Sequence, residues 1–522
     1  MKKQKKTPVF KRYDQSIIPL IPPSWDEFIT ENHPVRVVND VINRINLDSL
    51  HDEYQGGGRA NYHPKMLLKL VVYGYLCNIY SSRKLEAFAN ENIHCMWLTT
   101  LQRPDHNTIN RFRSARLKNP LKEIFTQVVK LLMESGHVGL QEVYIDGTKI
   151  EANANKYTFV WGKSIKGYKE KIGNQLEELW GYAESIAKEE MQQNTPPDFK
   201  KVDKEMVKQT VEAIDTALKE KVIDKKVKQK LSYGKKHWEE SVERYESQEK
   251  ILGDRNSYSK TDTDATFMRM KEDHMLNGQL KAAYNVQIST SDQVVLNYSL
   301  HQKPNDTTTL PGHVSEMVKL YGDKPENLTA DAGYGSEENY QYLHEQGIRA
   351  YVKYNTFDRE RRKKKDTNKL GVDTLYYNPE KDCYYCPMGQ QMNYAGEKIR
   401  FTENGYEQIL SCYTALNCEG CPLRGACHKS VGNRTIEINK QLSEYRREAA
   451  ELLTSEKGVA LRKKRCCDVE PVFGNMKQNK GFKRFLLRGL EKVAIEMGLV
   501  YLVHNLKKAW TLGFRVKELT MA

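Results

Sequence analysis

The chain has 522 residues, of which 82 are Lys or Arg and 68 are Asp or Glu, so its formal net charge is +14. At roughly 100–200 residues per domain, about two to four domains are expected. With 39% hydrophobic and 10% aromatic residues, the composition argues against a disordered protein. The positive excess favours a polyanionic partner such as nucleic acid, although a merely basic soluble protein is equally compatible with charge alone.

The sequence predicts neither a membrane span nor a secretory signal. The longest apolar stretch near the N-terminus, residues 66–77, is interrupted by Lys69. It is also shorter than the roughly 18–20 apolar residues that cross a bilayer. The N-terminal lysines are not followed by the apolar segment of a signal peptide. We therefore expect a cytoplasmic protein with no membrane partner.

Residues 1–130 are predicted to form an all-helical domain. Pro64 suits the first turn of a helix whose apolar residues recur three and four positions apart. Ser82 could cap a second helix, and Asp105 could cap a third over residues 106–118. Two short helices joined by a turn suit insertion into a DNA groove, whereas a solvated basic face is the simpler interpretation of the third helix alone. The candidate DNA-binding residues on this helix are Arg111, Arg113 and Arg116.

A mixed α/β sheet is predicted downstream. Its first strand runs into Asp146, and its fourth runs into Asp331. Open α/β sheets place their ligand sites at strand ends, so these acids mark a candidate site. Helices are expected before and after the fourth strand. The predicted strands are 142–146, a hairpin of 284–288 and 294–298, then 327–331 and 349–353.

The remaining segments are predicted to be insertions and terminal helices. Residues 165–252 have long, charged helical sequence, broken by Pro196 and Pro197, which predicts an inserted helical hairpin. The run 359–365 is almost entirely basic and predicts a loop that meets a polyanion. The expected division is a helical DNA-binding domain 1–130, an α/β core 140–164, 253–355 and 441–515, a helical insertion 165–252, and a basic loop with a cysteine-rich insertion 356–440.

A metal-binding site of the kind used for phosphoryl chemistry needs a third acid beside Asp146 and Asp331. Glu470 is the best candidate, because Pro471 places it at a helix start. Lys477 lies two turns further along the same face. Converging carboxylates suit Mg²⁺ or Mn²⁺, and two such ions can promote in-line displacement at a phosphodiester. Spacing alone does not select these three acids.

The cysteines are concentrated in one region. Six of the ten lie between residues 383 and 427. In a reducing cytoplasm this density favours structural zinc over disulfides. Reduced structural cysteines without metal remain the alternative. The favoured ligands are Cys386, Cys418, Cys421 and Cys427, with Cys383 and Cys412 as alternates and His428 less favoured.

The segments around the acids resemble those of DDE-type insertion-sequence transposases, in particular the branch grouped as insertion sequence family 1182. The resemblance covers nearly the whole chain in the expected order. It is carried by Tyr144-Ile-Asp-Gly-Thr-Lys-Ile-Glu-Ala-Asn-Ala-Asn155, Ala330-Asp-Ala-Gly-Tyr-Gly-Ser336, Val469-Glu-Pro-Val-Phe-Gly474 and Gly481-Phe-Lys-Arg-Phe485, together with 103–113 and 421–424.

The resemblance implies an RNase H-like core in which Asp146, Asp331 and Glu470 form the metal-binding triad. It also implies that Lys477 holds phosphates of the transposon end. Many related transposases carry an arginine four residues before the glutamate, where Cys466 stands here. Two neighbouring arginines could substitute, Arg465 and Arg462. Basic residues downstream, Arg484 and Arg488, complete the DNA-binding set beside the acids.

The function implied by the resemblance is transposition. The protein would bind the terminal inverted repeats of its element, cleave the DNA with magnesium and join the freed ends to target DNA. Its partners would be double-stranded DNA, as element ends and target, and further copies of itself. Its location would be the bacterial cytoplasm, at the nucleoid. Two alternatives stay open: a DNA-binding regulator derived from a transposase, and a related nuclease without strand transfer.

Overall fold

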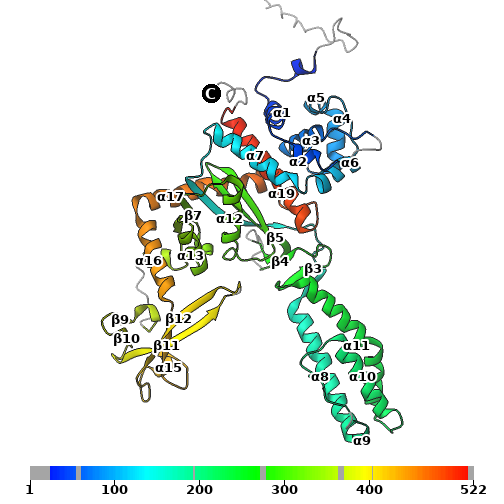
Figure 1. Cartoon of the computed structure of the whole chain (residues 1–522), viewed down its shortest axis with the longest axis vertical. Helices are drawn as coiled ribbons and strands as arrows, with labels where there is room; N and C mark the ends of the chain where they lie inside the picture. The colour runs from blue at the N-terminus through cyan, green and yellow to red at the C-terminus, as the bar shows by residue number, and fades with distance from the viewer. Residues whose placement is uncertain are drawn as a thin grey trace, which may run out of the picture.

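The structure is a computed structural model, and it describes residues 24–54, 60–191, 194–270, 278–361, 370–402 and 404–514. Figure 1 shows a central sheet with the N-terminal helices at one end of the molecule. A helical arm projects from the sheet on one side, and a separate β region lies on the other. Among the described helices, none is both long and apolar enough to cross a membrane.

The central sheet has six strands in the order β4-β5-β1-β7-β8, with β6 also paired to β5. β5 is antiparallel to β1, β4 and β6, whereas β1, β7 and β8 are parallel neighbours. This arrangement confirms the predicted mixed α/β fold. The strands are β1 (Glu142–Glu151), β4 (Thr266–Arg269), β5 (Leu280–Ser291), β6 (Val294–His301), β7 (Asn327–Ala330) and β8 (Arg349–Val352).

β1 is longer than the sequence pattern predicts. Its residues from Tyr144 to Glu151 pair with β5, so the strand continues beyond Asp146. The expectation that Asp146 ends the strand is therefore wrong, because pairing with a strand far away in the chain extends β1 past its apolar run. Asp331 does follow β7 directly, as predicted.

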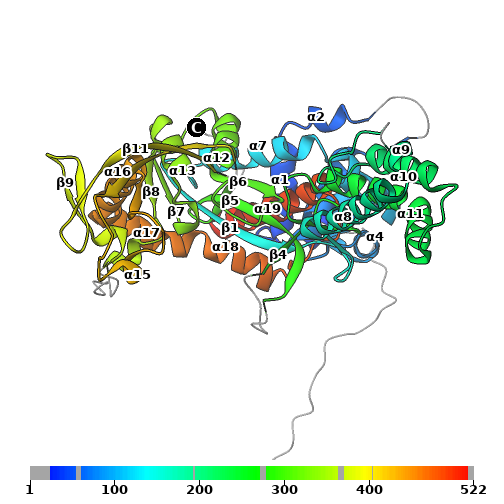
Figure 2. The ribbon, with the colours of Figure 1, turned by 90° about the horizontal axis from the view of Figure 1, so that it is seen from below.

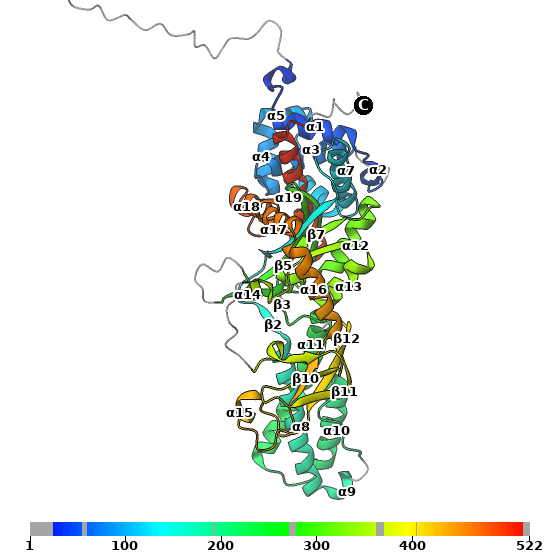
Figure 3. The same ribbon diagram turned by 90° about the vertical axis from the view of Figure 1, so that its left-hand side faces the viewer.

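Helices cover both faces of the sheet. Figures 2 and 3 show α12 and α13 on one side, and α17 and α18 on the other. The helices that surround the sheet are α7 (Pro120–Glu134), α12 (Leu310–Tyr321), α13 (Glu337–Glu345), α16 (Lys440–Thr454), α17 (Glu456–Asp468), α18 (Glu470–Gly474) and α19 (Leu490–Thr511). Shorter segments are η3 (Ala332–Tyr334), α14 (Phe357–Arg361) and η5 (Asn475–Asn479).

The N-terminal helices share one hydrophobic core with the sheet. α19 is buried around most of its circumference and packs against α3, α7 and β6. Asp105 caps α6 as predicted, since its Oδ1 accepts the backbone N–H of Thr108 at 2.9 Å. The elements are η1 (Trp25–Phe28), α1 (Pro34–Arg44), α2 (Asp48–His51), α3 (Pro64–Leu76), α4 (Ser82–Glu91), α5 (Ile93–Thr99), α6 (His106–Arg111) and the π-helical η2 (Phe112–Arg116).

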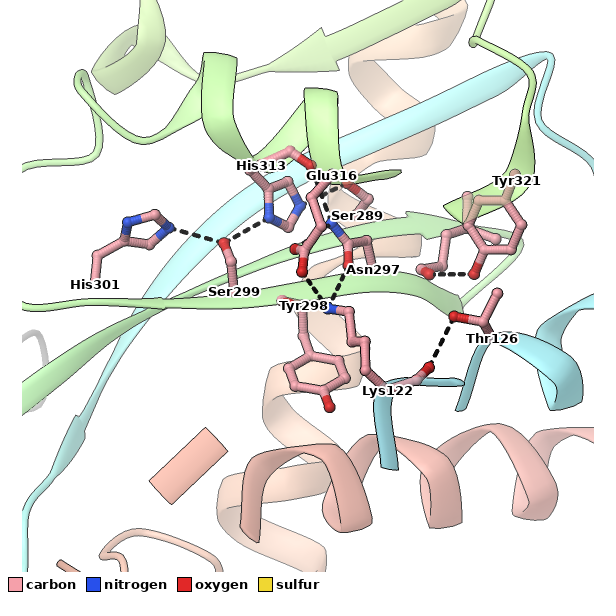
Figure 4. A network of polar contacts seen from close by, with 11 residues as sticks. Lys122, Thr126, Ser289, Asn297, Tyr298, Ser299, His301, His313, Glu316 and Tyr321 are labelled. Atoms are coloured by element: carbon pink, nitrogen blue, oxygen red, sulfur yellow. Dashed lines mark hydrogen bonds and ion pairs between the residues drawn. The ribbon is translucent and has the colours of Figure 1, made fainter. Parts of the chain in front are cut away.

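Polar side chains tie α7 and α12 to the sheet (Figure 4). Lys122 Nζ lies 3.2 Å from Glu316 Oε1 and donates to Asn297 Oδ1 at 2.8 Å. The ring of His313 lies between the hydroxyls of Ser289 and Ser299, with both N···O distances at 2.7 Å. Because these groups come from four elements, the network fixes the helices on the sheet.

The helical insertion is a three-helix arm rather than the predicted hairpin. α8 (Gly162–Ile186), α10 (Lys204–Leu218) and α11 (Lys225–Leu252) pack around their own core. The break between α10 and α11 contains neither Pro nor Gly. Its main sequence signal is Asp224, which caps α11. The sequence pattern therefore did not predict this break. Smaller elements at this arm are β2 (Phe159–Trp161), α9 (Lys188–Met191) and β3 (Ser257–Ser259).

The cysteine-rich region forms a second, antiparallel sheet in the order β13-β12-β11-β10-β9. Its longest strands, β11 and β12, form a ribbon whose end contacts α13, where Gln408 Nε2 donates to Glu337 Oε2 at 2.8 Å. The elements are η4 (Val372–Thr374), β9 (Tyr376–Asn378), β10 (Cys383–Tyr385), β11 (Gln391–Phe401), β12 (Glu407–Ala415), α15 (Arg424–Cys427) and β13 (Thr435–Ile438).

Candidate active site

The fold brings Asp146 and Asp331 to neighbouring strands. β1 and β7 are parallel, and Tyr144 pairs with Thr329. Asp146 and Asp331 each follow two residues later, so both carboxylates lie at the same level of the sheet. Asp331 Oδ1 accepts the backbone N–H of Gly333 at 2.9 Å, which holds the turn after β7.

Arg465 lies between the two aspartates. Its Nη2 is 3.1 Å from Asp146 Oδ2 and 3.7 Å from Asp331 Oδ2. The exposed fractions of the side chains are 15% for Arg465, 10% for Asp146 and 38% for Asp331. A guanidinium shared by two carboxylates offsets their mutual repulsion. Arg465 is one of the two arginines that the sequence suggested as a substitute for the residue at Cys466.

A third aspartate, Asp306, stands beside this pair and was not selected from the sequence. It lies between β6 and α12, and its Oδ1 accepts hydrogen bonds from Asn285 Nδ2 at 2.7 Å and Gln287 Nε2 at 2.8 Å. Gln287 in turn accepts a hydrogen bond from the Tyr334 hydroxyl. Burial raises the pKa of Tyr334, and the carboxylates of Asp306, Asp146 and Asp331 raise it further. The Asn-Asp pair at 305–306, just before a helix, is the only sequence signal for this residue.

Glu470 begins α18, with Pro471 in the first helical turn, as its sequence position predicts. The residue is exposed. Within the described ranges, no group of three or more His, Cys, Asp or Glu residues is placed so that it could hold a metal ion. The side chains of Asp146, Asp331 and Glu470 thus do not form such a group. Of these three predicted ligands, the structure brings together only Asp146 and Asp331.

The predicted DNA-binding residues near the acids differ in exposure. Lys477 lies in η5 and is mostly covered. Arg484 and Arg488 are exposed residues that dock on the chain just after β1. Arg484 Nη2 donates to the carbonyl of Ala154 at 2.8 Å, and Arg488 Nε donates to the carbonyl of Asn153 at 2.8 Å. These contacts fix both arginines beside the end of the strand that carries Asp146.

The three N-terminal arginines do not share a surface. Arg111 is exposed at the end of α6. Arg113 is only 3% exposed, and its Nη1 donates to the hydroxyl of Tyr75 at 3.2 Å. Arg113 is therefore a buried structural residue, and the prediction that it contacts DNA is corrected. Arg116 is half-buried, with its guanidinium 4.8 Å from the centre of the Tyr54 ring.

An open pocket of about 630 Å³ lies beside two of these arginines. Arg111 and Arg116 line it together with Tyr54 and Tyr62. Of the basic run 359–365, residues 359–361 belong to α14, and the rest lies outside the described residues, as do the N-terminal lysines.

The four favoured cysteines surround one small cavity of about 20 Å³, which His428 also lines. Three N–H groups point at their sulfur atoms. Gln390 N lies 3.3 Å from Cys386 Sγ, Arg434 N lies 3.3 Å from Cys418 Sγ, and Arg434 Nη1 lies 2.9 Å from Cys427 Sγ. The alternates Cys383 and Cys412 lie on β10 and β12 and do not line this cavity. As noted above, no metal-holding group of three or more residues is found among the described residues.

Two transposase families match the chain. Residues 23–115 match the family described as Transposase domain (DUF772), and residues 385–510 match the family described as Transposase DDE domain. The second match includes Glu470, Lys477 and the cavity-lining cysteines, whereas Asp146 and Asp331 lie outside both. No curated protein matches the chain. The matches do not favour a regulator or a nuclease without strand transfer. Lying near opposite ends of the chain, the two matches support a DDE-type transposase.

Proposed function

We propose that the protein is a DNA transposase of the insertion-sequence type, related to the branch grouped as insertion sequence family 1182. It binds the terminal inverted repeats of its element, cleaves at the element ends and transfers the freed strands to target DNA. The observation that carries this proposal is the pairing of Asp146 and Asp331 on neighbouring parallel strands, bridged by Arg465. The sheet order supports the RNase H-like core, with three antiparallel strands (β6, β5, β1) followed by β7 and β8 parallel to β1.

The proposed metal ligands are Asp146, Asp331 and Glu470. The carboxylates of Asp146 and Asp331 fit Mg²⁺ or Mn²⁺, which prefer hard oxygen ligands. When bound, such ions activate the attacking oxygen and stabilise the departing one. Arg465 offsets part of the negative charge of the two aspartates and can turn to a DNA phosphate, since its guanidinium suits phosphate geometry as well as carboxylate.

The DNA surface that we propose combines exposed arginines of the core and the N-terminal helices, namely Arg484, Arg488 and Arg111, with Arg116 at the edge of the adjoining pocket. Lys477 is mostly covered, so a phosphate contact by its ammonium group requires a rearrangement of η5. Two element ends must be held together during transposition, so we propose that the protein acts as a homo-oligomer on DNA. Such a protein would work at the nucleoid in a bacterial cytoplasm.

The test is nicking of DNA that contains the element end, in the presence of Mg²⁺, by wild type, Asp146→Asn and Asp331→Asn. Both variants should lose more than about 100-fold in rate, because even residues behind a metal ligand are worth about 10–100-fold. Asp323→Asn is the matched control, since Asp323 is exposed in the loop before β7. Equal nicking by all four proteins, or none by any, would refute the catalytic assignment.

The cysteine-rich region is proposed to bind a structural zinc ion through Cys386, Cys418, Cys421 and Cys427. Two observations support this ligand set: the shared cavity, and the N–H groups directed at the sulfur atoms, one of which belongs to the Arg434 guanidinium beside Cys427. Zinc is bound by thiolates, and N–H donors and a cation beside the sulfur atoms suit the negative charge of such a centre. Four thiolates around zinc carry a net charge of about −2, which Arg434 partly offsets.

Zinc content of the purified full chain tests this part separately. Wild type and Cys412→Ser should each carry about one zinc ion per chain in native mass spectrometry, four thiolates sufficing for one ion. Cys421→Ser should lose it. An equal zinc content in both variants, or no mass loss when wild type is treated with a chelator, would remove the zinc proposal and leave the catalytic one standing.

A further inference from the structure

The edge of the sheet that carries Asp331 continues into the segment after β8. Because β7 and β8 are parallel neighbours, the turn after Asp331 and residues 353–361 leave the sheet at the same edge. The two segments also touch, since a Cβ built on Gly335 would lie 2.9 Å from Tyr354 Cα. α17 packs against both strands, and α16 packs against β8. Side chains of these two helices can therefore meet the segment after β8 beside the proposed catalytic pair.

Three arginines stand over two aromatic rings of this segment, and together they are called the arginine cluster. The guanidinium carbon of Arg462 lies 5.3 Å from the centre of the Phe357 ring, and that of Arg361 lies 6.0 Å from the same centre. The guanidinium carbon of Arg446 lies 5.8 Å from the centre of the Tyr354 ring. The centres of the two rings are 5.5 Å apart, and both rings are buried. Cation–π contacts of this kind attract an arginine without neutralising its charge.

Within the described ranges, the three guanidinium groups of the arginine cluster make neither an ion pair nor a hydrogen bond. The Nε atoms of Arg446 and Arg462 are buried without an acceptor among those residues. Two acids of the same segment already have partners. Asp358 Oδ2 lies 3.0 Å from Lys353 Nζ, and the Glu360 carboxylate accepts a tyrosine hydroxyl at 2.7 Å. Guanidinium groups usually form charge-assisted hydrogen bonds to anions, so this site lacks an acceptor.

The charges of the arginine cluster also act on one another. Burial lowers the pKa of Arg462, and the charge of Arg361 lowers it further, whereas the carboxylate of Asp358 raises it. Partly buried like charges repel, and an anion bound between them relieves that repulsion. The arrangement is therefore suited to a negatively charged ligand.

The arginine cluster adjoins the proposed catalytic pair along α17. Arg465, which bridges Asp146 and Asp331, lies three residues after Arg462 in this helix. Residues three apart on a helix are neighbours on one face, with Cβ atoms about 5–6 Å apart. A DNA strand carries one negative charge per nucleotide, about every 3.4 Å along the axis. A strand whose cleaved phosphate lies at the two aspartates therefore brings its next phosphates toward the arginine cluster.

We propose that Arg361, Arg446 and Arg462 form a binding site for phosphates of the element-end DNA, next to the phosphate that is cleaved. This inference rests on the proposed transposase function and extends its DNA surface to α14, α16 and α17. The planar guanidinium matches phosphate geometry. Contacts to phosphates carry no sequence information, so the site holds the strand in register and does not select its sequence.

DNA affinity of Arg446→Gln and Arg462→Gln tests the site, with end-containing duplex DNA and a chelator present so that no cleavage occurs. Each variant should bind at least about 10-fold more weakly than wild type, as expected for the loss of a hydrogen bond between charged groups. The slope of log K against log salt should fall by about one unit in each variant. Arg447→Gln is the matched control, because it removes the same charge from an exposed position of α16. It should bind like wild type.

Thermal unfolding distinguishes a DNA-binding role from a structural one. Since no described residue pairs with these guanidinium groups, Arg446→Gln and Arg462→Gln should melt close to wild type. Affinity and salt slope equal to those of Arg447→Gln would overturn the inference, whatever the melting temperatures are.

Single neutral methylphosphonates in the same DNA locate the contact. Neutralising at least one phosphate beside the cleaved one should weaken binding by wild type but should not weaken binding by Arg462→Gln any further. Equal losses in both proteins at every phosphate would show that Arg462 does not contact the strand.

These measurements need neither metal nor cleavage, so they separate the two levels of proposal. If Asp146→Asn nicks DNA like wild type in Mg²⁺, the catalytic assignment fails while the affinity results still decide the arginine cluster. If Asp146→Asn is inactive and both cluster variants bind DNA normally, the transposase proposal stands and the arginine cluster alone is refuted. Wild type that does not bind end-containing DNA would refute both.

Discussion

At the scale of single residues, Gly147 shows how closely the site is packed. A Cβ at this position would meet the Gln287 amide and lie 2.8 Å from Asp306 Oδ1. A side chain after Asp146 would therefore force the ends of Gln287 and Asp306 to move, and these ends are held by hydrogen bonds to each other and to Asn285. This is a physical reason for the Asp-Gly pair at 146–147, which the sequence presents only as part of a motif.

Gly147→Ala should lower the free energy of unfolding by about 1–3 kcal/mol, the usual cost of overpacking a filled site. Gly312→Ala is the matched control, because a Cβ at Gly312 meets nothing within 4 Å. Gly312 lies in α12, a helix that packs on the same sheet as Gly147. The control should be neutral or up to about 1 kcal/mol more stable, since Ala favours a helix over Gly. Urea unfolding measures both, and equal stabilities of the two variants would contradict the packing argument.

At the scale of elements, the segment from α6 to η2 carries one exposed and one buried arginine, Arg111 and Arg113. Residues two positions apart on a helix point to different sides, so Arg111 and Arg113 could not both face DNA. Arg113 points inward to Tyr75 and Asn110, while Arg111 stays at the surface. Helical spacing alone could have revealed this division. The sequence cannot tell, however, which of the two sides is buried.

Arg113→Ala and Arg111→Ala should therefore behave as opposites. Arg113→Ala leaves the Tyr75 hydroxyl without this donor and exposes no new surface, so we expect destabilisation of about 1–3 kcal/mol. Arg111→Ala should keep the melting temperature and weaken DNA binding, with the salt dependence of log K reduced by about one unit of slope. Thermal unfolding tests the stability of both variants, and DNA-binding titrations at several salt concentrations test the phosphate contact of Arg111. Weaker DNA binding by Arg111→Ala with an unchanged salt slope would argue against a phosphate contact.

At the scale of the whole molecule, buried histidines link helices to the sheet. His313 holds Ser289 and Ser299, and His504 Nε2 lies 2.8 Å from the carbonyl of Gln293 (Figure 4 shows the first site). Burial lowers the pKa of His313 well below its ordinary value and that of His504 to about 4. Both rings are therefore neutral in the folded protein at neutral pH.

This predicts a loss of stability in mild acid. Below the ordinary histidine pKa of about 6.5 the unfolded chain takes up protons that the folded chain does not, so unfolding becomes easier as the pH falls. The free energy of unfolding should fall by up to about 1.4 kcal/mol per pH unit for each of the two histidines. The contribution of His504 is complete near its folded pKa of about 4.

Urea unfolding of wild type and His313→Asn between these pH values provides the check. The substitution should lower stability at neutral pH and flatten the pH dependence, since one group no longer titrates differently in the two states. Glu496 works in the opposite direction, because burial raises its pKa. An unchanged slope in His313→Asn would show that His313 does not titrate as proposed.

The sequence by itself determined the features that depend on residues adjacent in the chain. The alternation of strands and helices, the cap at Asp105, the helix start at Glu470 and the motifs around the two strand acids all follow from local patterns. The resemblance of these motifs to those of insertion-sequence transposases also indicated a transposase before any contact was known. Helix breaks without Pro or Gly, such as the one before α11, were not predicted, because they carry almost no local sequence signal.

Only the tertiary structure decided which groups meet. Asp306, Arg465 and the Asp146–Asp331 pair lie far apart in the chain, and strand pairing and helix packing bring them together. Which side of a helix is buried, as at Arg113, and how far a strand extends, as for β1 beyond Asp146, likewise depend on partners that are distant in sequence. Burial and charge at a site are properties of the packed chain, because they are set by every element around the site and not by its own segment.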